Sequence, residues 1–499
     1  MEIRPGLNPA SEVPLYRQLS VYLHRLIESG ELRAGDRLPP TRELAGQLGL
    51  NRTTVSAAYE LLETHGLIKG EVGRGSYVSG AGNSGAANAL RTVQDEHLKW
   101  SRLLTPSVAP PAPPAAPGVI SFTNSRPSDN LFPIEEFRAS CLEVLASPNM
   151  KALLQLGSPG GYEPLRRFLL DRAVAQGVAR VGDDILITNG CQQALDLLRR
   201  SLVRPGDKVA MEDPVYPGLR NLFLESGAEL IGIPVGRQGL DPVALQRAFD
   251  AGARLVVVTP SFQNPTGATI PADHRVAICS MARAAGAAII ENDIYSELSC
   301  ALPDSRSPAL PRLKKLDGNV ILLGSFSKVA FPGVRVGWII GPRPVIARAT
   351  ELKQLADLHT DHLSQAFLLH FAQSGRLAAH EAHVLEAARE KLRALEESCR
   401  SHLSDCTWNI PSGGMNIWIG LPAGLDAVSL RGLAQQAGID YLPGRYFAVS
   451  RAQDSGLRLS FAGLEPGEIR EGIRILGSLI QRAVGLRGVA AQSPALAMV

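Results

Sequence analysis

The chain has 499 residues, of which 45% are hydrophobic and 20% charged, a composition typical of a globular protein with two or three domains. Lysine and arginine (51) nearly balance aspartate and glutamate (48), so the net charge of +3 predicts no general attraction to nucleic acid or membrane, and any DNA contact must be local. The chain shows no CxxC pair among its six cysteines, no run of eighteen apolar residues and no signal peptide, which favours a cytoplasmic protein with reduced thiols, no metal site and no membrane span.

The first 80 residues predict a small helical domain. Apolar residues recur at helical spacing over residues 15–27, and Gly30 is placed to end that helix in the left-handed conformation. Thr41 is placed to cap a second helix and Asn51 a third. Because only a short glycine-containing turn separates these two helices, the pattern predicts a helix-turn-helix.

A glycine-rich hairpin is predicted directly after the third helix, in the segment LIKGEVGRGSYV, with glycines 70, 73 and 75 in its turn. Together with LPPTRELAGQLGLNRTTVSAAYELL before it, this segment resembles the winged helix-turn-helix of the GntR family of repressors. The resemblance implies that the start of the third helix enters the major groove of double-stranded DNA, with Arg52 reading guanine edges and the other residues holding phosphates. The DNA-binding residues expected on this basis are Arg42, Arg52, Thr53, Thr54, Ser56, Arg74 and Gly75.

An interaction module with solvated charges is the alternative for this domain, because its first 80 residues carry equal numbers of basic and acidic side chains. The clustering of Arg37, Arg42, Arg52 and Arg74 within the motif favours DNA. We therefore expect a DNA-binding domain at 12–80, followed by a flexible linker rich in proline, glycine and alanine at 81–118.

Five short motifs follow in the remaining chain: TNGCQQAL from residue 188, DPVYPG from 213, NPTG from 264, ENDIYSE from 291 and SFSK ending at Lys328. A lysine at the exit of a buried strand can be stripped of solvent and made nucleophilic, which suggests that Lys328 forms a Schiff base. In this order the motifs resemble those of the fold-type-I aminotransferases, which use pyridoxal 5′-phosphate. We expect this domain at 119–485 and a disordered tail at 486–499.

The resemblance implies a role for each motif residue. Lys328, Asp293 and Tyr295 form the expected catalytic set, in which Asp293 keeps the pyridine nitrogen protonated. Asn264 and Tyr295 contact the phenolic oxygen, Tyr216 covers one face of the ring, and Arg458 clamps the substrate carboxylate. The expected phosphate-binding residues are the helix-start residues Gly190, Cys191 and Gln192 together with Ser325 and Arg335.

One residue departs from the family pattern. Relatives have a tyrosine that reaches the neighbouring subunit's cofactor phosphate at the start of the segment that here reads LGSPGGYEPLR, and this chain has Leu156. The hydroxyl is therefore lost, and we expect weaker cofactor binding or slower turnover.

A GntR-like domain joined to an aminotransferase-like domain resembles the MocR subfamily of transcription regulators. The implied architecture is an N-terminal α+β winged helix-turn-helix, then an α/β domain with a large mixed, mostly parallel sheet, and a smaller C-terminal α+β domain. The implied function is a homodimeric, PLP-dependent regulator that binds paired DNA half-sites and senses an amine, an amino acid or the cofactor itself. An active aminotransferase with an appended DNA-binding head stays open as the alternative, and a relic without cofactor is a third.

Overall fold

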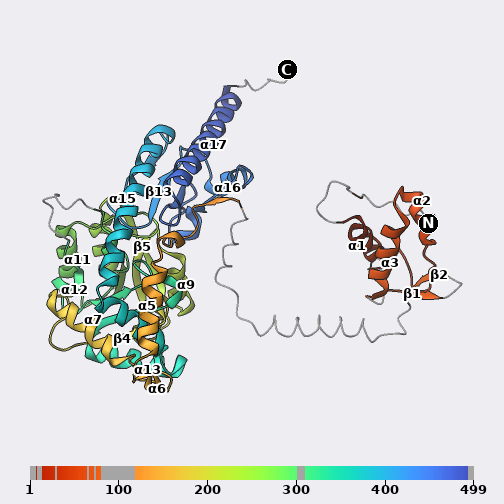
Figure 1. The fold of residues 1–499 in the computed structure, drawn as a ribbon. Coiled ribbons are helices and arrows are strands. Elements are labelled where there is room, and N and C mark those ends of the chain that lie inside the picture. The colour runs from red at the N-terminus through yellow and green to blue at the C-terminus, as the bar shows by residue number, and fades with distance from the viewer. Residues whose placement is uncertain are drawn as a thin grey trace. The chain divides into compact units, whose positions relative to one another are not determined.

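The computed structural model describes residues 7, 14–28, 31–64, 67–71, 75–79, 118–300 and 310–492, and the chain forms two compact units, Met1–Ser107 and Val108–Val499 (Figure 1). Several sequence expectations lie outside the described residues: the helix end at Gly30, the wing residues Gly73 and Arg74, the linker apart from Gly118, and the tail from residue 493.

The N-terminal unit has three helices and a hairpin, which confirms the predicted winged helix-turn-helix. Its elements are α1 (Leu15–Glu28), α2 (Thr41–Leu48), α3 (Arg52–Thr64), β1 (Ile68–Glu71) and β2 (Gly75–Val78). Leu19, Leu23, Val55, Ala58 and Leu62 are fully buried and form its core. The two strands pair antiparallel, with Ile68 opposite Val78.

Local details of this unit differ from the sequence predictions at two places. Asn51 does cap α3, because its Oδ1 accepts a hydrogen bond from the N–H of Thr53 at 3.1 Å. Thr41, in contrast, is already the first helical residue; Pro40 precedes it and no side chain caps α2. Gly70 and Gly75 lie within the strands rather than in the turn, because a glycine can pair through its backbone like any other residue.

The C-terminal unit is built around an eight-stranded sheet in the order β4-β11-β10-β9-β8-β5-β6-β7. The five strands from β10 to β6 run parallel, while β11 and β7 are antiparallel to their neighbours, which confirms the predicted mixed, mostly parallel sheet. The strands of this unit are β3 (Ile120–Ser121), β4 (Asp183–Thr188), β5 (Lys208–Asp213), β6 (Glu229–Gly236), β7 (Gly239–Leu240), β8 (Leu255–Val258), β9 (Ala288–Asn292), β10 (Ile321–Ser325), β11 (Gly337–Pro342), β12 (Thr407–Trp408), β13 (Asn416–Gly420), β14 (Ile439–Asp440), β15 (Leu442–Pro443) and β16 (Gly456–Ser460).

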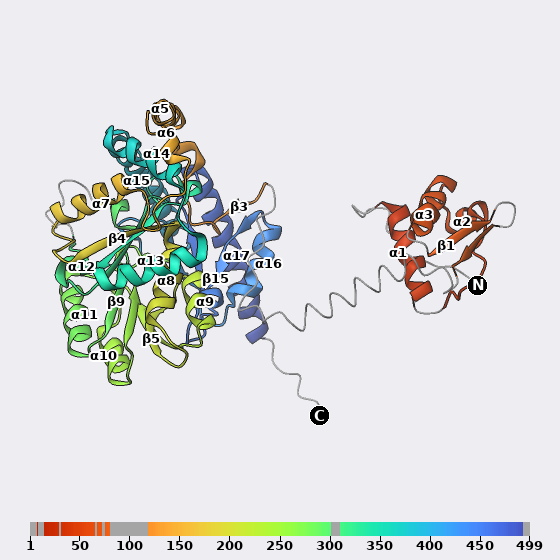
Figure 2. The ribbon, with the colours of Figure 1, turned by 90° about the horizontal axis from the view of Figure 1, so that it is seen from below.

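Helices cover both faces of this sheet (Figure 2) because its strands are apolar on both sides. Leu186 packs with α8, α9 and α13 on one face, whereas its neighbours Ile185 and Ile187 pack with α7 and α14 on the other. The helices are α5 (Ile134–Leu145), α6 (Met150–Leu153), α7 (Glu163–Ala175), α8 (Gly190–Leu202), α9 (Pro217–Glu225), α10 (Pro242–Asp250), α11 (Ala272–Ala284), α12 (Leu313–Leu316), α13 (Arg343–Asp357), α14 (His362–Gln373), α15 (Arg376–His402), α16 (Ala427–Gln436) and α17 (Pro466–Gln492).

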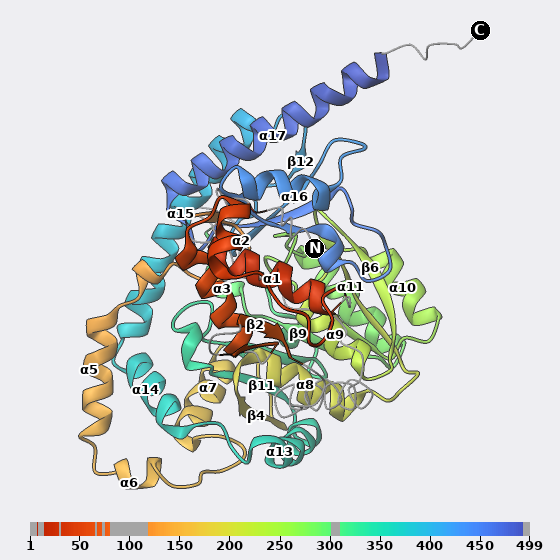
Figure 3. The ribbon, with the colours of Figure 1, turned by 90° about the vertical axis from the view of Figure 1, so that its right-hand side faces the viewer.

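A second, smaller layer completes the unit. The antiparallel sheet β12-β13-β16-β15 and the parallel pair β14-β3 pack on α16 and on the long helices α15 and α17, which lie side by side (Figure 3). The predicted tail is wrong for residues 486–492, which continue α17. Five of these seven residues (Leu486, Arg487, Ala490, Ala491 and Gln492) favour a helix, against Gly488 and Val489, which do not. The six cysteines are free, and in the described part of the chain no helix is long and apolar enough to cross a membrane.

Candidate functional site

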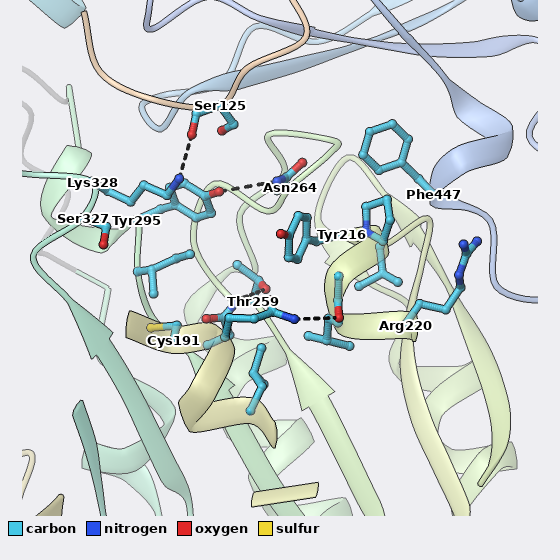
Figure 4. Close-up of a pocket in the computed structure, with 18 of the residues that line it drawn as sticks. Ser125, Cys191, Tyr216, Arg220, Thr259, Asn264, Tyr295, Ser327, Lys328 and Phe447 are labelled. Atoms are coloured by element: carbon cyan, nitrogen blue, oxygen red, sulfur yellow. Dashed lines mark hydrogen bonds between the residues drawn. The ribbon is translucent and has the colours of Figure 1, made fainter. Parts of the chain in front are cut away.

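A cavity of about 570 Å³ opens where the parallel strands of the large sheet end (Figure 4). Its walls come from the residues that follow β4, β5, β8, β9 and β10, because the carboxyl ends of parallel strands meet at one edge. The small layer closes the cavity with Arg458 of β16 and with Tyr446 and Phe447 of the 3₁₀ turn η4 (Gly444–Phe447).

The start of α8 and Arg335 lie together at one end of the cavity and offer donors suited to an anion; we call this group the anion cradle. The first N–H groups of a helix have no partner within the helix, and those of α8 belong to Gly190, Cys191 and Gln192. Gly190 has a φ of +72°, and a Cβ there would lie 2.9 Å from Cζ of Arg335 and nearer still to Nη2, so only glycine lets the guanidinium approach. Ser325 lines the same end, and its hydroxyl lies 3.0 Å from that of Ser327.

Cys191 lies in this cradle as a neutral thiol. Burial raises the pKa of Cys191 to about 12, although Lys328 and Arg335 oppose the effect, and its sulfur donates to the carbonyl of Gly324. The thiol is therefore protonated at neutral pH and is not a nucleophile. The group that Cys191 offers to an anion is its backbone N–H at the start of α8.

Lys328 projects into the middle of the cavity, three residues beyond the end of β10. Its Nζ donates to the carbonyl of Ser125 at 2.7 Å and lies 5.7 Å from the ring centre of Tyr295. The amide of Asn264 donates to the hydroxyl of Tyr295 at 3.5 Å, and both side chains are buried. An amine and two hydrogen-bonding groups thus converge on one point, as Figure 4 shows. Tyr216 lines the wall nearby and is partly exposed.

Arg458 is a buried guanidinium with no carboxylate partner in the described part of the chain. It donates to the carbonyl of Thr123 and, at 3.3 Å, to Oδ1 of Asn264, while its Nε is buried without a hydrogen bond. Its Cζ lies 5.1 Å from the ring centre of Phe447. Burial lowers the pKa of Arg458 to about 10, so it is still charged at neutral pH. An anionic partner stabilises a buried charge of this kind, and a ligand can supply one.

Asp293 directly follows β9, between the cavity-lining residues Asn292 and Ile294. Its Oδ2 accepts hydrogen bonds from the hydroxyl of Ser296 and from Nε of Arg312, so that Asp293 belongs to a charged cluster next to the cavity. Burial opposes the charge of Arg312, but the carboxylates of Asp293 and Glu297 raise its pKa. The structure records no partner for Oδ1 of Asp293 within the described residues, which leaves one oxygen for the expected contact with a pyridine nitrogen.

A protonated acid lies under the same edge of the sheet. Oε2 of Glu212 accepts hydrogen bonds from the N–H of Thr259 at 3.2 Å and from the side chain of Gln263 at 3.3 Å. Its Oε1 is buried without a partner among the described residues. Burial raises the pKa of Glu212 to about 8, so this side chain is mostly neutral at pH 7.

Sequence reasoning missed several residues of this site. Ser125, Thr123, Phe447 and Arg220 belong to no motif, and Arg312 is separated from Asp293 by 19 positions. Local sequence carries no signal for such contacts, because each joins segments that meet only in the folded chain.

The expected DNA-binding residues that the structure describes are exposed or half-buried. Arg42, Arg52, Thr53 and Gly75 are exposed, Thr54 and Ser56 are half-buried, and Arg74 lies outside the described residues. Arg52 and Thr53 begin α3, directly after the cap at Asn51. The hydroxyl of Tyr59 donates to the carbonyl of Pro39 at 2.8 Å and so fixes α3 against the start of α2.

The donor set of the cavity fits pyridoxal 5′-phosphate. A phosphate matches the α8 cradle and Arg335, an aldehyde matches the amine of Lys328, and a phenolic oxygen matches Tyr295 and Asn264. Gly190 leaves the space that a Cβ would fill, and the cavity volume is that of a site for a small molecule.

Comparison with known proteins gives two family matches. Residues 147–476 match aminotransferase class I and II, and residues 15–78 match bacterial regulatory proteins of the gntR family. The chain is 30% identical to the uncharacterized HTH-type transcriptional regulator YdfD of Bacillus subtilis (strain 168) over 96% of this chain and 98% of that protein. It is 31% identical to the HTH-type transcriptional regulator TauR of Rhodobacter capsulatus over 94% of this chain and 96% of that protein.

Among solved structures, the chain is similar to LysN, the α-aminoadipate aminotransferase of Thermus thermophilus, complexed with N-(5′-phosphopyridoxyl)-L-leucine. The TM-score is 0.68 at 32% sequence identity, and the match covers 74% of this chain and 94% of that one.

Proposed function

The chain belongs to the MocR-type transcription regulators, in which a gntR-family DNA-binding domain precedes an aminotransferase class I and II domain, and on this premise we propose that it couples ligand binding at Lys328 to DNA affinity. Pyridoxal 5′-phosphate is the cofactor of the second domain. The ligand in this proposal is an amine or amino acid, or the cofactor itself.

The buried guanidinium of Arg458 is the observation that carries this proposal. It has no acidic partner among the described residues, and it faces a cavity that also contains the amine of Lys328. A molecule with an amino group and a carboxylate matches both groups at once. When bound, pyridoxal 5′-phosphate supplies an aldehyde that joins an amine and a ring that withdraws electrons. This chain's own residues orient both partners.

The position of the two residues supports a conformational response. Lys328 follows β10 of the large sheet, whereas Arg458 lies on β16 of the small sheet. A ligand that contacts both therefore favours the arrangement in which the two layers are close, and it shifts the population toward that arrangement. We propose that this shift changes how a pair of DNA-binding domains reaches its operator. The proposed place of action is the cytoplasm.

A leucine surface supports a homodimer. Leu154, Leu156, Leu355 and Leu358 are 57–81% exposed, and the segments that carry them are adjacent because Gly157 packs directly against His362. Asp357 joins this surface to the start of α8 through a hydrogen bond from Asn189 at 3.2 Å. An apolar surface of this kind is typical of a protein interface, and a second copy of the chain is the proposed occupant. The effect of Leu156 on a neighbouring cofactor stays a prediction.

The test is operator binding by the full-length protein loaded with cofactor, with and without each member of a panel of amino acids and simple amines. We expect one ligand class to change the operator Kd by about five-fold or more, which corresponds to a coupling of ~1 kcal/mol. Lys328→Ala should still bind the operator but lose both the visible absorbance and the response. Lys315→Ala, which removes an exposed lysine, is the matched control.

An active aminotransferase is the second candidate, because the amine, the phenol and the carboxylate-binding arginine all lie in one cavity. Turnover is expected far below the median enzyme rate of about 10 per second. Turnover near that rate, with operator affinity unchanged by every ligand, would refute the sensing proposal and support the enzyme.

A further inference from the structure

The charge of the cavity is unbalanced. Four basic side chains, Lys328, Arg335, Arg458 and Arg220, line it, and no aspartate or glutamate is among its described lining residues. In the proposed function the cofactor phosphate contacts Arg335, the cofactor aldehyde joins Lys328, and a carboxylate of the ligand contacts Arg458. Arg220 is the one basic side chain of the cavity to which the proposed function assigns no contact.

Arg220 is held in place at the cavity mouth. It lies four residues after Tyr216, where Tyr216 caps α9, so both residues belong to the same side of the helix. Its Nη1 donates to the carbonyl of Ala448 at 2.6 Å and its Nε to Oδ1 of Asn221 at 3.1 Å. No acceptor for Nη2 is recorded among the described residues. The fork is thus fixed in position with part of its donor capacity unused.

Asp213 makes no direct contact with Arg220 among the described residues. It is near enough to oppose the effect of burial, which lowers the pKa of Arg220, but its carboxylate forms no ion pair with Arg220 in the described chain. Both of its oxygens already accept backbone hydrogen bonds, from the N–H groups of Val449, Ser450 and Arg451 at 2.9–3.0 Å. Arg220 therefore keeps its capacity to bind an anion.

The segment of Phe447 and Ala448 contacts both guanidinium groups. Arg458 lies against the Phe447 ring, and Arg220 donates to the carbonyl of the next residue, Ala448. A ligand held by Arg458 through its α-carboxylate therefore has a second cation available farther along the same wall.

We propose that Arg220 is a second anion-binding group of this cavity, and that the regulator's ligand is an amino acid with an acidic side chain, of the dicarboxylic class. This inference rests on the proposed function, since it assigns the α-carboxylate to Arg458. It also predicts ligand selectivity: an amino acid of equal length with a neutral side chain leaves Arg220 without a ligand contact and binds more weakly.

The alternative role for Arg220 is a purely structural one, as an anchor for residues 444–451. That segment has other anchors, however. The N–H of Val215 donates to the carbonyl of Phe447 at 2.9 Å, and the N–H of Gly232 donates to Oγ of Ser450 at 3.0 Å. Loss of a mere anchor would weaken all ligands alike, whereas loss of an anion-binding group would weaken only ligands with the second acid.

The experiment uses two pairs of amino acids with equal carbon chains: L-2-aminoadipate with L-norleucine, and L-glutamate with L-norvaline. Their Kd values are measured from the change in visible absorbance of the cofactor-loaded, full-length protein. The variants are wild type, Arg220→Gln and, as the matched control, Ser450→Ala, which loosens the segment without changing a cavity residue.

In wild type we expect at least one diacid to bind roughly tenfold or more tightly than its neutral partner, the effect of one charge-assisted contact. Arg220→Gln should remove this difference, while Ser450→Ala should leave it unchanged. Equal binding within both wild-type pairs, an equal loss for all four ligands in Arg220→Gln, or no binding by any of them overturns the proposal. Failure of the sensing function is seen separately, as ligand binding that leaves operator affinity unchanged.

Discussion

Replacement of Gly190 by alanine tests the anion cradle directly. The residue has a φ of +72°, and a Cβ there would lie 2.9 Å from Cζ of Arg335. Since the obstructing atoms are the tip of a flexible side chain, we expect Arg335 to move aside rather than the fold to break. The guanidinium then leaves the start of α8, where the phosphate is expected.

Two separate losses follow from this change. The left-handed backbone conformation should cost alanine roughly 1–2 kcal/mol of folding free energy. Loss of a charged hydrogen bond to the phosphate should cost about 1.5–3 kcal/mol of binding free energy, which corresponds to a roughly 10- to 100-fold increase in the cofactor Kd.

The assay is an equilibrium titration of cofactor-free protein with pyridoxal 5′-phosphate, followed by visible absorbance, together with thermal unfolding. Gly286→Ala is the matched control, because Gly286 has a similar φ of +63° but no atom within 4 Å of the added Cβ. Both variants should lose similar stability, and only Gly190→Ala should lose cofactor affinity. The reasoning is refuted if Gly190→Ala binds the cofactor as tightly as Gly286→Ala does.

Three further predictions concern other residues. Glu212 has a pKa of about 8 in the folded protein but near 4.5 in the unfolded chain, so its presence lowers the folding stability increasingly from pH 4.5 to pH 8. The stability of Glu212→Gln relative to wild type should therefore rise by up to ~1.4 kcal/mol per pH unit across that window. A difference in melting temperature that does not change with pH would contradict this. Arg52→Ala should lose ~1–3 kcal/mol of operator binding free energy and discriminate less at one base pair, whereas Arg42→Ala should bind all sequences more weakly to the same extent in competition assays. Footprints on the operator should show two half-sites. Arg312→Gln leaves the buried carboxylate of Asp293 without its ion-pair partner. The melting temperature of Arg312→Gln should therefore be lower than that of the double variant Arg312→Gln with Asp293→Asn. The opposite order would mean that the ion pair does not stabilise the cluster.

Local signals were sufficient for most of the elements, whereas the expected cavity residues came from the family resemblance. The helix-turn-helix follows from apolar spacing and from the cap at Asn51, and the strand ends follow from short apolar runs before Gly190, Asp293 and Lys328. These signals work because each depends on a few consecutive residues. The errors at Thr41 and at residues 486–492 concern element ends, where one turn of helix depends on small differences in free energy.

Only the tertiary structure decided which charges are paired. The family resemblance implies that Asp293 contacts the cofactor, and the fold adds Arg312 as its ion-pair partner from 19 positions along the chain. It likewise brings Arg458 to the carbonyl of Thr123 and places Arg220 beside the segment that carries Phe447. Each contact joins residues far apart in the chain, and whether a buried charge is satisfied depends on every neighbour in space, which no local pattern records.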